Sequence, residues 1–232
     1  GRIDFLKGLW QRGHVHYIGA LTTHAMVAAA NGLPSALSEA AGMIGDPQVR
    51  NRGTIGGNVA HADPASDLPT VLTALRAQFR IAGSNGERRV SADDFFVGFF
   101  ETALADDELL VGVAVFDERP NSGSAYAKLP NPASRYAMVG AAATVTIDDG
   151  KFRKAGVAVG GLTPKATRAN AVEAALVGNP VSEATIAAAA AAVANDLGDD
   201  VMGDLHASAE YRRQMAPVFV RRALETAVSR AS

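Results

Sequence analysis

Cysteine is absent from all 232 residues of the chain. This absence excludes disulfides, thiol nucleophiles, cysteine-ligated zinc and iron–sulfur clusters held by this chain. The sequence also lacks any uninterrupted apolar run of the roughly 18 residues that a membrane span needs. We therefore expect no transmembrane segment. Hydrophobic residues still make up 48% of the chain, which is typical of a globular protein with a buried core.

Neither sign of charge is in excess. The chain has 22 Lys and Arg against 24 Asp and Glu, a formal net charge of −2. We therefore expect neither a disordered chain nor a nucleic-acid partner. Sequence patterns of common catalytic and nucleotide sites are missing as well, because no GxSxG, GxGxxG or GxxxxGK[ST] occurs. No carboxylate pair has a spacing that indicates acid–base chemistry, so we expect no catalytic residue.

Residues 1–117 are predicted to form a first domain with both helices and strands. Residues 45–65 hold two Asp-Pro pairs and several glycines, which predicts a loop. A helix is predicted from Ser66 or Asp67 to Leu75 because apolar residues recur on one face. The other elements expected here are strands over 14–19 and 109–116, helices over 25–30 and 34–41, and a hairpin of 78–82 with 88–90.

Residues 118–232 are predicted to form a second domain with a three-stranded antiparallel sheet and a helix bundle. Two β-rich runs, 139–147 and 152–160, are joined by Asp148-Asp149-Gly150, a strong hairpin signal. With a strand over 124–129 they complete the sheet. The helices are predicted over 166–177, 182–196 and 209–229, and Pro217 should kink the last one or start a second helix. The fold class is therefore α+β.

The strongest local signal for a binding site lies in residues 48–58, within the predicted loop. Glycines at 53, 56 and 57 allow positive φ angles and close approach of a ligand to the backbone. Exposed N–H groups in such a turn could cradle an anion, with Thr54 and Asn58 adding side-chain hydrogen bonds. An ordinary surface turn that needs glycine explains the pattern equally well.

Three further side-chain sets have both a structural and a functional explanation. Asp67 is explained as a helix cap or as an acceptor for sugar or ribityl hydroxyls. Lys128 is explained as an ordinary strand lysine or as a partner for an electron-rich ring edge. His14 and His16 form an HxH pair without a third ligand nearby, so we expect no metal site.

Residues 46–75, DPQVRNRGTIGGNVAHADPASDLPTVLTAL, closely resemble the second flavin-binding motif of the FAD-binding medium subunits of molybdenum hydroxylases. This family includes aerobic carbon monoxide dehydrogenase, bacterial N-heterocycle hydroxylases and the flavin domain of xanthine dehydrogenase. Weaker matching stretches run along the whole chain. They are IGALTTH (18–24), DELLVGV (107–113), AYAKL (125–129), SRYAMVGAAATV (134–145) and AEYRRQMAPVFVRRALE (209–225).

The resemblance implies a vanillyl-alcohol-oxidase-like, or PCMH-type, FAD-binding subdomain in 1–117, followed by the C-terminal domain of the carbon monoxide dehydrogenase flavoprotein in 118–232. It also implies that FAD is contacted by nine residues in three groups. The motif residues would wrap the cofactor, Asp67 would bind one of its hydroxyls, and Leu109, Lys128 and Tyr136 would lie near the isoalloxazine ring. The motif residues are Thr54, Ile55, Gly56, Gly57 and Asn58.

By the same resemblance, we expect the chain to be an electron-transfer subunit of a heterotrimeric molybdenum hydroxylase. We expect this complex in the cytoplasm, either free or attached peripherally to the inner membrane face. A large molybdopterin subunit would oxidise the substrate, and a small [2Fe–2S] subunit would relay electrons to FAD, which would reduce an external acceptor. The assembly expected is a dimer of heterotrimers. Two alternatives stay open: a stand-alone flavin oxidoreductase, and an assembly subunit with a vestigial flavin motif.

The sequence departs from the family pattern at one place. Family members carry another glycine-rich phosphate loop, of the type AGGxS, in a small N-terminal subdomain. No such loop occurs in these 232 residues, and the chain opens on Gly-Arg-Ile-Asp rather than on Met. We therefore expect the 232-residue chain by itself to bind FAD weakly or not at all.

Overall fold

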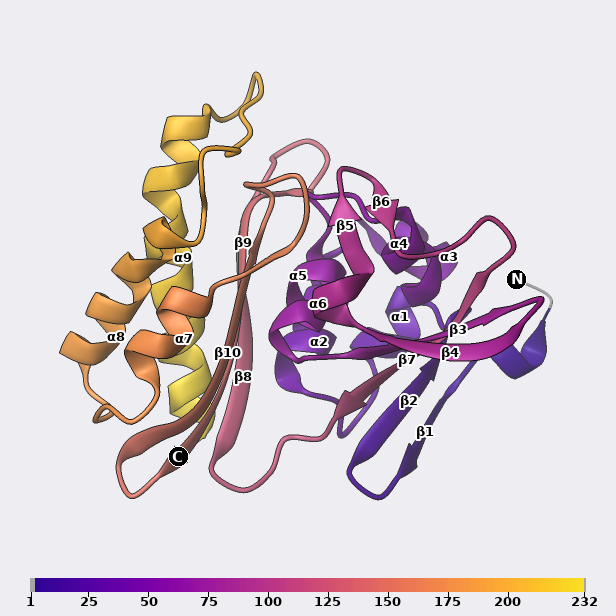
Figure 1. Ribbon diagram of the computed structural model, residues 1–232, viewed down its shortest axis with the longest axis horizontal. Coiled ribbons are helices and arrows are strands. Elements are labelled where there is room, and N and C mark those ends of the chain that lie inside the picture. Colours follow the sequence, from indigo (N-terminus) through magenta and orange to yellow (C-terminus); the bar gives the residue numbers. More distant parts are fainter. Residues whose placement is uncertain (1–2, 232) are drawn as a thin grey trace.

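Two antiparallel sheets with helices packed against them make up the computed structural model, which describes residues 3–231 (Figure 1). The first sheet has five strands in the order β1-β2-β7-β3-β4, and the second has four in the order β11-β10-β9-β8. A small third sheet pairs β5 with β6. The strands are β1 Leu9–Arg12, β2 Val15–Gly19, β3 Gln78–Gly83, β4 Gly86–Ser91, β5 Phe96–Gly98, β6 Glu101–Thr102, β7 Leu109–Phe116, β8 Ser122–Pro130, β9 Ala137–Asp148, β10 Lys151–Gly160 and β11 Thr167–Arg168.

Most helices begin at a polar side chain that caps the first turn. These caps are hydroxyl or carboxylate oxygens that accept a hydrogen bond from a backbone N–H three residues on, as at Thr23, Asp46, Thr54, Ser91, Ser182 and Ser208. The helices are η1 Asp4–Leu6, α1 His24–Ala28, α2 Ser35–Met43, α3 Pro47–Arg52, α4 Ile55–His61, α5 Asp67–Ala74, α6 Ala92–Phe95, α7 Asn170–Leu176, α8 Glu183–Ala191, η2 Ala192–Asn195 and α9 Ala209–Arg230.

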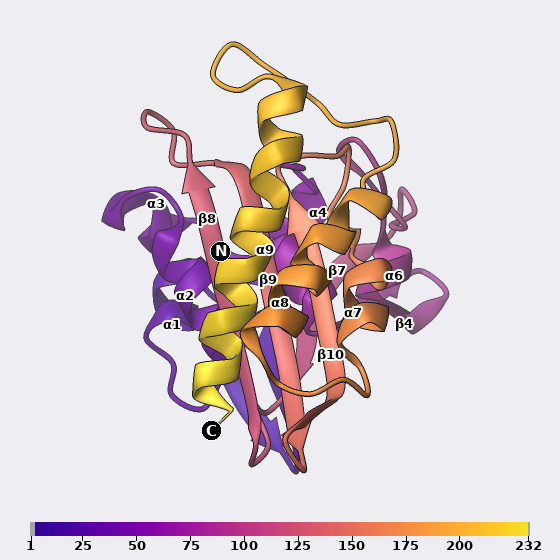
Figure 2. The ribbon, with the colours of Figure 1, turned by 90° about the vertical axis from the view of Figure 1, so that its left-hand side faces the viewer.

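Helix α5 joins the two halves of the molecule. It packs against β9 and β10 of the second sheet and against α2 and α4 of the first half, and all of its residues are buried, as expected of a helix enclosed on every side. Glycine lets it come close, because a Cβ at Gly160 would collide with the Thr70 hydroxyl of α5. The opposite face of the second sheet is covered by α7, α8 and α9 (Figure 2).

The structure corrects three predictions. Residues 45–65 are not one loop, because α3 and α4 form within them. The second sheet has four strands rather than three, since the two-residue β11 pairs with Ala158 and Val159 of β10. Of the two alternatives at Pro217, the start of a second helix is wrong, because α9 runs through this residue as one helix of 22 residues. Within residues 3–231, no helix combines the length and the apolar character that a membrane crossing requires.

His24, at the start of α1, should make stability depend on pH. Its side chain is 3% exposed, and its Nδ1 has no hydrogen-bond partner in the part of the chain described. Burial lowers the pKa of His24 from 6.5 to about 4. The unfolded chain therefore takes up this proton at a higher pH than the folded chain. As pH falls from about 6.5 to about 4, we expect the free energy of unfolding to drop by at most about 3 kcal/mol.

Urea unfolding of the wild type and of His24→Gln at several pH values measures this effect. Between about pH 6.5 and about pH 4, the free energy of unfolding of the variant should fall less than that of the wild type. If both proteins lose stability equally over that interval, the assignment to His24 is wrong.

Candidate functional site

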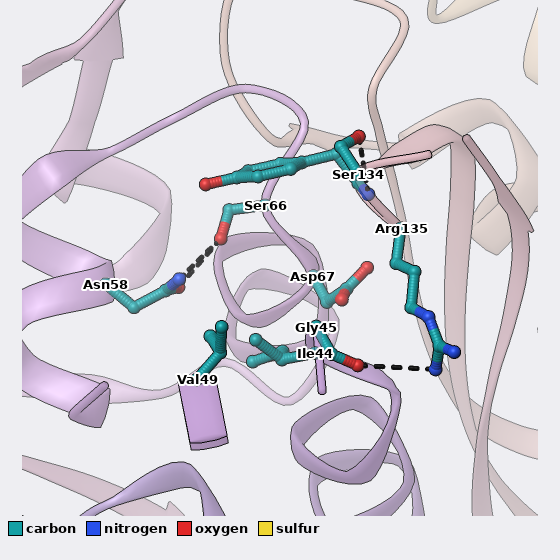
Figure 3. A pocket seen from close by; sticks show the side chains of 9 residues that line it. Ile44, Gly45, Val49, Asn58, Ser66, Asp67, Ser134 and Arg135 are labelled. Carbon is teal, nitrogen blue, oxygen red and sulfur yellow. Dashed lines mark hydrogen bonds between the residues drawn. The ribbon is translucent and has the colours of Figure 1, made fainter. Parts of the chain in front are cut away.

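A pocket lies where the first half of the molecule meets the loop between β8 and β9 (Figure 3). Its volume is about 200 Å³. Apolar side chains from the turn before α3 and from α3 face polar side chains from α4, α5 and the loop 131–136. The lining residues are Ile44, Gly45, Val49, Asn58, Ser66, Asp67, Ser134, Arg135 and Tyr136.

Asn58 and Ser66 form one polar edge of this pocket. The Asn58 amide lies 2.6 Å (Nδ2) and 2.9 Å (Oδ1) from the Ser66 hydroxyl oxygen. Asn58 belongs to α4, and Ser66 is the residue just before α5. The contact ties the two helices together, and it presents an amide and a hydroxyl side by side, a combination that both donates and accepts hydrogen bonds.

Asp67 lies deeper and belongs to a buried charged group. Its Oδ2 accepts a hydrogen bond from Lys128 Nζ at 2.7 Å, and its Oδ1 accepts one from the Tyr126 hydroxyl at 2.7 Å. The Lys128 side chain is 4% exposed and that of Asp67 is 5% exposed. Lys128 also donates to the Met43 carbonyl at 3.3 Å. Of the two explanations of Asp67, the helix cap is wrong, because this carboxylate bonds to side chains of β8 instead.

The surroundings of this group shift two pKa values in the same direction. Burial raises the pKa of the Asp67 carboxyl above its usual value, and the charge and hydrogen bond of Lys128 and the hydrogen bond of Tyr126 only partly offset that rise. Burial, together with the neighbouring Asp67 charge and hydrogen bond, raises the pKa of Tyr126 well above its usual value. The Tyr126 hydroxyl therefore stays protonated and keeps donating to Asp67.

The loop 131–136 brings Tyr136 to the pocket and is held by its own hydrogen bonds. The buried Asn131 side chain accepts from the N–H groups of Ala133 and Ser134. The Asn131 N–H donates to the Tyr136 carbonyl at 2.7 Å. Arg135, at a φ of 63°, reaches across to the Gly45 carbonyl at 3.4 Å (Figure 3). Burial and the charges of Asp63 and Asp67 raise the pKa of Tyr136, so its ring faces the pocket as a neutral phenol.

The glycine motif adopts a conformation other than the predicted one. Gly56 and Gly57 lie in the first turn of α4, and neither has a positive φ. The N–H groups of Ile55 and Gly56 donate to Thr22 and Ala20 carbonyls at 2.9 and 2.8 Å. Those of the next two residues donate to the Thr54 hydroxyl and carbonyl. The prediction of a turn with unbonded N–H groups is therefore wrong.

Close packing, rather than backbone conformation, explains Gly56. A Cβ at this position would lie 2.7 Å from both the Cα and the carbonyl oxygen of Ala20. We expect Gly56→Ala to lower the free energy of unfolding by about 1–3 kcal/mol, because the added methyl group forces backbone apart. Chemical denaturation measures this, with Gly42→Ala as the control, because Gly42 also lies in a helix and a Cβ there would meet only the Ala28 methyl group, at 3.9 Å. An unchanged denaturation midpoint for Gly56→Ala would contradict the packing argument.

The structure brings together three of the nine predicted FAD-binding residues as pocket lining: Asn58, Asp67 and Tyr136. Lys128 lies directly behind Asp67, and Gly57 is exposed on the turn of α4 that carries Asn58. Four others have positions apart from the pocket lining. Thr54 caps α4, Ile55 is in the core, Gly56 is buried against Ala20, and Leu109 is 67% exposed at the start of β7.

Sequence reasoning missed several lining residues. Ser66 was considered only as a helix cap, yet it accepts no cap hydrogen bond and pairs with Asn58. Ser134 and Arg135 could have been found from the sequence Asn131-Pro132-Ala133-Ser134, because asparagine followed by proline is a turn signal. The apolar lining by Ile44 and Val49 has no comparable signal, since it depends on how the α3 segment folds back.

The pocket residues suit one part of FAD better than another. The Asn58–Ser66 pair and Asp67 offer hydrogen bonds to hydroxyl groups, while Ile44, Val49 and Tyr136 offer contact to a flat ring. A volume of about 200 Å³ is below the roughly 300–1,000 Å³ of whole-ligand pockets. The residues therefore fit the polyol and ring portion of the cofactor, whereas the N–H groups of residues 55–58 are already bonded and leave no pyrophosphate cradle.

Comparison with protein families assigns both halves of the chain. Residues 1–115 match the family described as FAD binding domain in molybdopterin dehydrogenase. Residues 124–227 match the family described as CO dehydrogenase flavoprotein C-terminal domain. Together the two matches include the pocket, since they contain the α4 and α5 residues on one side and the loop 131–136 on the other.

Similar proteins and structures agree with this assignment. The chain is 39% identical to the 6-hydroxypseudooxynicotine dehydrogenase complex subunit alpha of Paenarthrobacter nicotinovorans, over 99% of this chain and 78% of that protein. It is 36% identical to the carbon monoxide dehydrogenase medium chain of Hydrogenophaga pseudoflava, over 99% and 80%.

Two solved structures share the fold. A carbon monoxide dehydrogenase structure from Hydrogenophaga pseudoflava superposes with a TM-score of 0.95 at 37% identity, covering 100% of this chain and 81% of that one. Quinoline 2-oxidoreductase from Pseudomonas putida 86 superposes with a TM-score of 0.89 at 30% identity, covering 99% and 80%. The chain therefore belongs to the family of FAD-binding medium subunits of molybdenum hydroxylases and is an oxidoreductase subunit of the carbon monoxide dehydrogenase type.

Proposed function

We propose that this chain holds FAD at the pocket between α4, α5 and the loop 131–136, accepts electrons from a [2Fe–2S] subunit and passes them to an external acceptor. One observation supports this most strongly. Asn58 and Asp67 lie in the first half of the chain and Tyr136 in the second, all three match motif positions of the family, and they line a single pocket. FAD supplies the redox chemistry when bound, because it exchanges electrons both singly and in pairs.

The chain's own residues bind and orient the cofactor. We assign the Asn58–Ser66 pair and Asp67 to its hydroxyl groups and Tyr136 to its ring. The exposed Gly57 leaves space for the cofactor over the first turn of α4. Thr54, Ile55 and Gly56 place that turn through the cap and the bonds to the Thr22 and Ala20 carbonyls, and any direct contact they make with FAD stays a prediction.

We assign Lys128 two roles, one in holding Asp67 in place and one beside the cofactor ring. In the structure its ammonium group is bonded to the Asp67 carboxylate, so the pair is close to neutral overall. The pair fixes the position of the Asp67 carboxylate in the pocket, because Lys128 is held in turn by the Met43 carbonyl. We propose that Lys128 lies beside the ring, where its charge favours added electrons, and that Leu109 makes an apolar contact near the same ring.

The partners proposed are a large molybdopterin subunit that selects the substrate and a small subunit that holds the [2Fe–2S] clusters, assembled as a dimer of heterotrimers. The absence of cysteine from this chain is consistent with that division, since iron–sulfur clusters need thiolate ligands. Relatives are named as subunits or medium chains of such dehydrogenases. The cytoplasmic location expected from the resemblance stays a prediction.

Anaerobic reduction of the assembled complex tests the proposal. On addition of the substrate of the molybdenum subunit, the flavin absorbance near 450 nm should bleach, and an external acceptor should restore it. A complex stripped of flavin should still oxidise substrate until its remaining redox centres are reduced. It should then stop, because electrons no longer reach the external acceptor. Full turnover without flavin, or flavin that never bleaches, would contradict an electron-transfer role.

A further inference from the structure

A second hollow, of about 550 Å³, lies away from the pocket, between the end of α5, the start of β10 and α7. Three cationic side chains line it: Arg76, Arg153 and Lys154. Its remaining lining is small or apolar apart from Asn170 and Glu173. Ala155 comes from β10, Ala174 from α7, and Val177 from the end of that helix. None of these residues belongs to the proposed FAD site.

A β-bulge turns two consecutive cations toward this hollow. In the pairing of β10 with β9, Phe152 lies opposite Ile147 and Lys154 opposite Thr146, so Arg153 is the extra residue of the bulge. Successive residues of a regular strand point to opposite faces. Here Arg153 and Lys154 are both exposed and both line the hollow, because a bulge redirects the side chains around it.

The positive charge of the hollow is not balanced inside this chain. Its single carboxylate, on Glu173, is already shared between Arg76 at 3.1 Å and Arg168 at 2.8 Å, and it also accepts from the Val157 N–H at 2.9 Å. Arg153 and Lys154 form no hydrogen bond or ion pair through their side chains within residues 3–231. The hollow therefore has two uncompensated cations in a chain whose net charge is −2.

We propose that this basic hollow is a docking surface for an acidic segment of a partner subunit. The assignment builds on the chain being one subunit of a larger complex, and it is independent of where FAD binds. Carboxylates of such a segment would pair with Arg153 and Lys154, and its apolar side chains would contact Ala155, Ala174 and the half-exposed Val177.

The openness of the hollow favours a protein segment over a small anion. A small-molecule site normally buries 70–90% of its ligand, whereas the Arg76 side chain here is 60% exposed and both other cations are exposed. A segment lying across the hollow would cover all three cations together. The β10 edge beside the hollow is open only over a short stretch. It lies between Phe152, whose backbone bonds to Gly178 and Asn179, and Val157, whose backbone bonds to Ala169 and to the Glu173 side chain. A segment would therefore bind here mainly through its side chains.

A simpler explanation is that the two cations and the bulge only protect this sheet edge from pairing with another copy of the chain. Charge reversal separates the two explanations. Glutamates at 153 and 154 would still protect an edge, because any charge there opposes pairing, but they would repel an acidic partner segment. Serines at both positions would remove the protection as well as the attraction.

The experiment measures the affinity of this chain for the remaining subunits of its complex. It compares the wild type with the double variant Arg153→Glu and Lys154→Glu. We expect the dissociation constant to rise at least tenfold, and we expect added NaCl to weaken the wild-type complex more than the variant. The matched control is Arg12→Glu with Arg119→Glu, which changes the net charge equally at exposed arginines elsewhere. Flavin content per assembled complex should stay at the wild-type value, which distinguishes this test from a failure of the FAD site.

Two results would overturn the proposal. One is a charge-reversed chain that assembles like the wild type at every salt concentration. The other is a variant with Arg153→Ser and Lys154→Ser that self-associates while the glutamate variant assembles normally, since this combination is the behaviour of a protected sheet edge alone.

Discussion

Replacing Asp67 with alanine is expected to lower the free energy of unfolding by about 3–5 kcal/mol, the cost typical of removing one partner from a buried ion pair. Asp67 is the acceptor for both the Lys128 ammonium and the Tyr126 hydroxyl. Without it, the Lys128 side chain, 4% exposed, retains only the Met43 carbonyl as a partner. Urea denaturation of the chain at neutral pH measures the loss.

A double-mutant cycle shows whether the loss comes from the pair. Lys128→Met alone should also destabilise, because it leaves the Asp67 carboxylate buried without a counter-ion. The double variant Asp67→Ala with Lys128→Met should be more stable than the sum of the single effects, by up to about 3 kcal/mol. Strict additivity would mean that the two side chains do not interact in the folded protein.

Gly57→Val is expected to weaken FAD binding in the assembled complex by at least about tenfold, which corresponds to about 1.4 kcal/mol. Gly57 is exposed on the first turn of α4, next to the pocket residue Asn58, and a Cβ there meets only the Thr54 hydroxyl, at 3.0 Å. A branched side chain at this point would therefore extend into the space assigned to the cofactor while leaving the core unchanged. Flavin absorbance per mole of purified complex measures the effect.

Gly57→Ala is the matched control for helix stability. Alanine is more favourable than glycine in a helix by roughly 0.5–1 kcal/mol, so a fold defect in α4 should not occur in this variant. Flavin content should fall in the order glycine, alanine, valine while the thermal midpoint stays close to that of the wild type. Full flavin content in Gly57→Val would contradict the assignment of the cofactor to this surface.

Local sequence signals predicted much of the fold. The Asp148-Asp149-Gly150 turn predicted the β9–β10 hairpin, and the hairpin predicted for 78–82 with 88–90 forms as β3 and β4. The helix predicted over 25–30 forms as α1, which Thr23 caps. These features depend on residues close together in the chain, so the sequence alone contains the information that specifies them.

The 45–65 segment was mispredicted because tertiary contacts override its weak propensity. Glycine pairs and prolines disfavour helices, yet Pro47 occupies the first turn of α3, where proline is tolerated. The α4 turn forms because its first N–H groups bond to the Thr22 and Ala20 carbonyls, more than 30 residues earlier. No local pattern predicts those bonds, and without them the glycines indicate a loop.

Local patterns indicated Asn58 and Asp67 as candidates, but only the resemblance joined them with Tyr136 in one site. The family motif pointed to Asn58, Asp67 and Tyr136, which the structure places around one pocket. The bond between Asp67 and Lys128 was not predictable from either residue, because it joins positions 61 residues apart through the packing of α5 on the second sheet. The role of Leu109 has no counterpart in the pocket lining and still depends on the resemblance alone.

Electron cryo-microscopy of the flavin-loaded complex tests the central claim most directly. The account predicts cofactor density over the first turn of α4, in contact with Asn58, Asp67 and Tyr136, with the isoalloxazine beside Lys128. Density for the cofactor on another face of this chain, with the pocket between α4 and the loop 131–136 filled only by solvent, would contradict it.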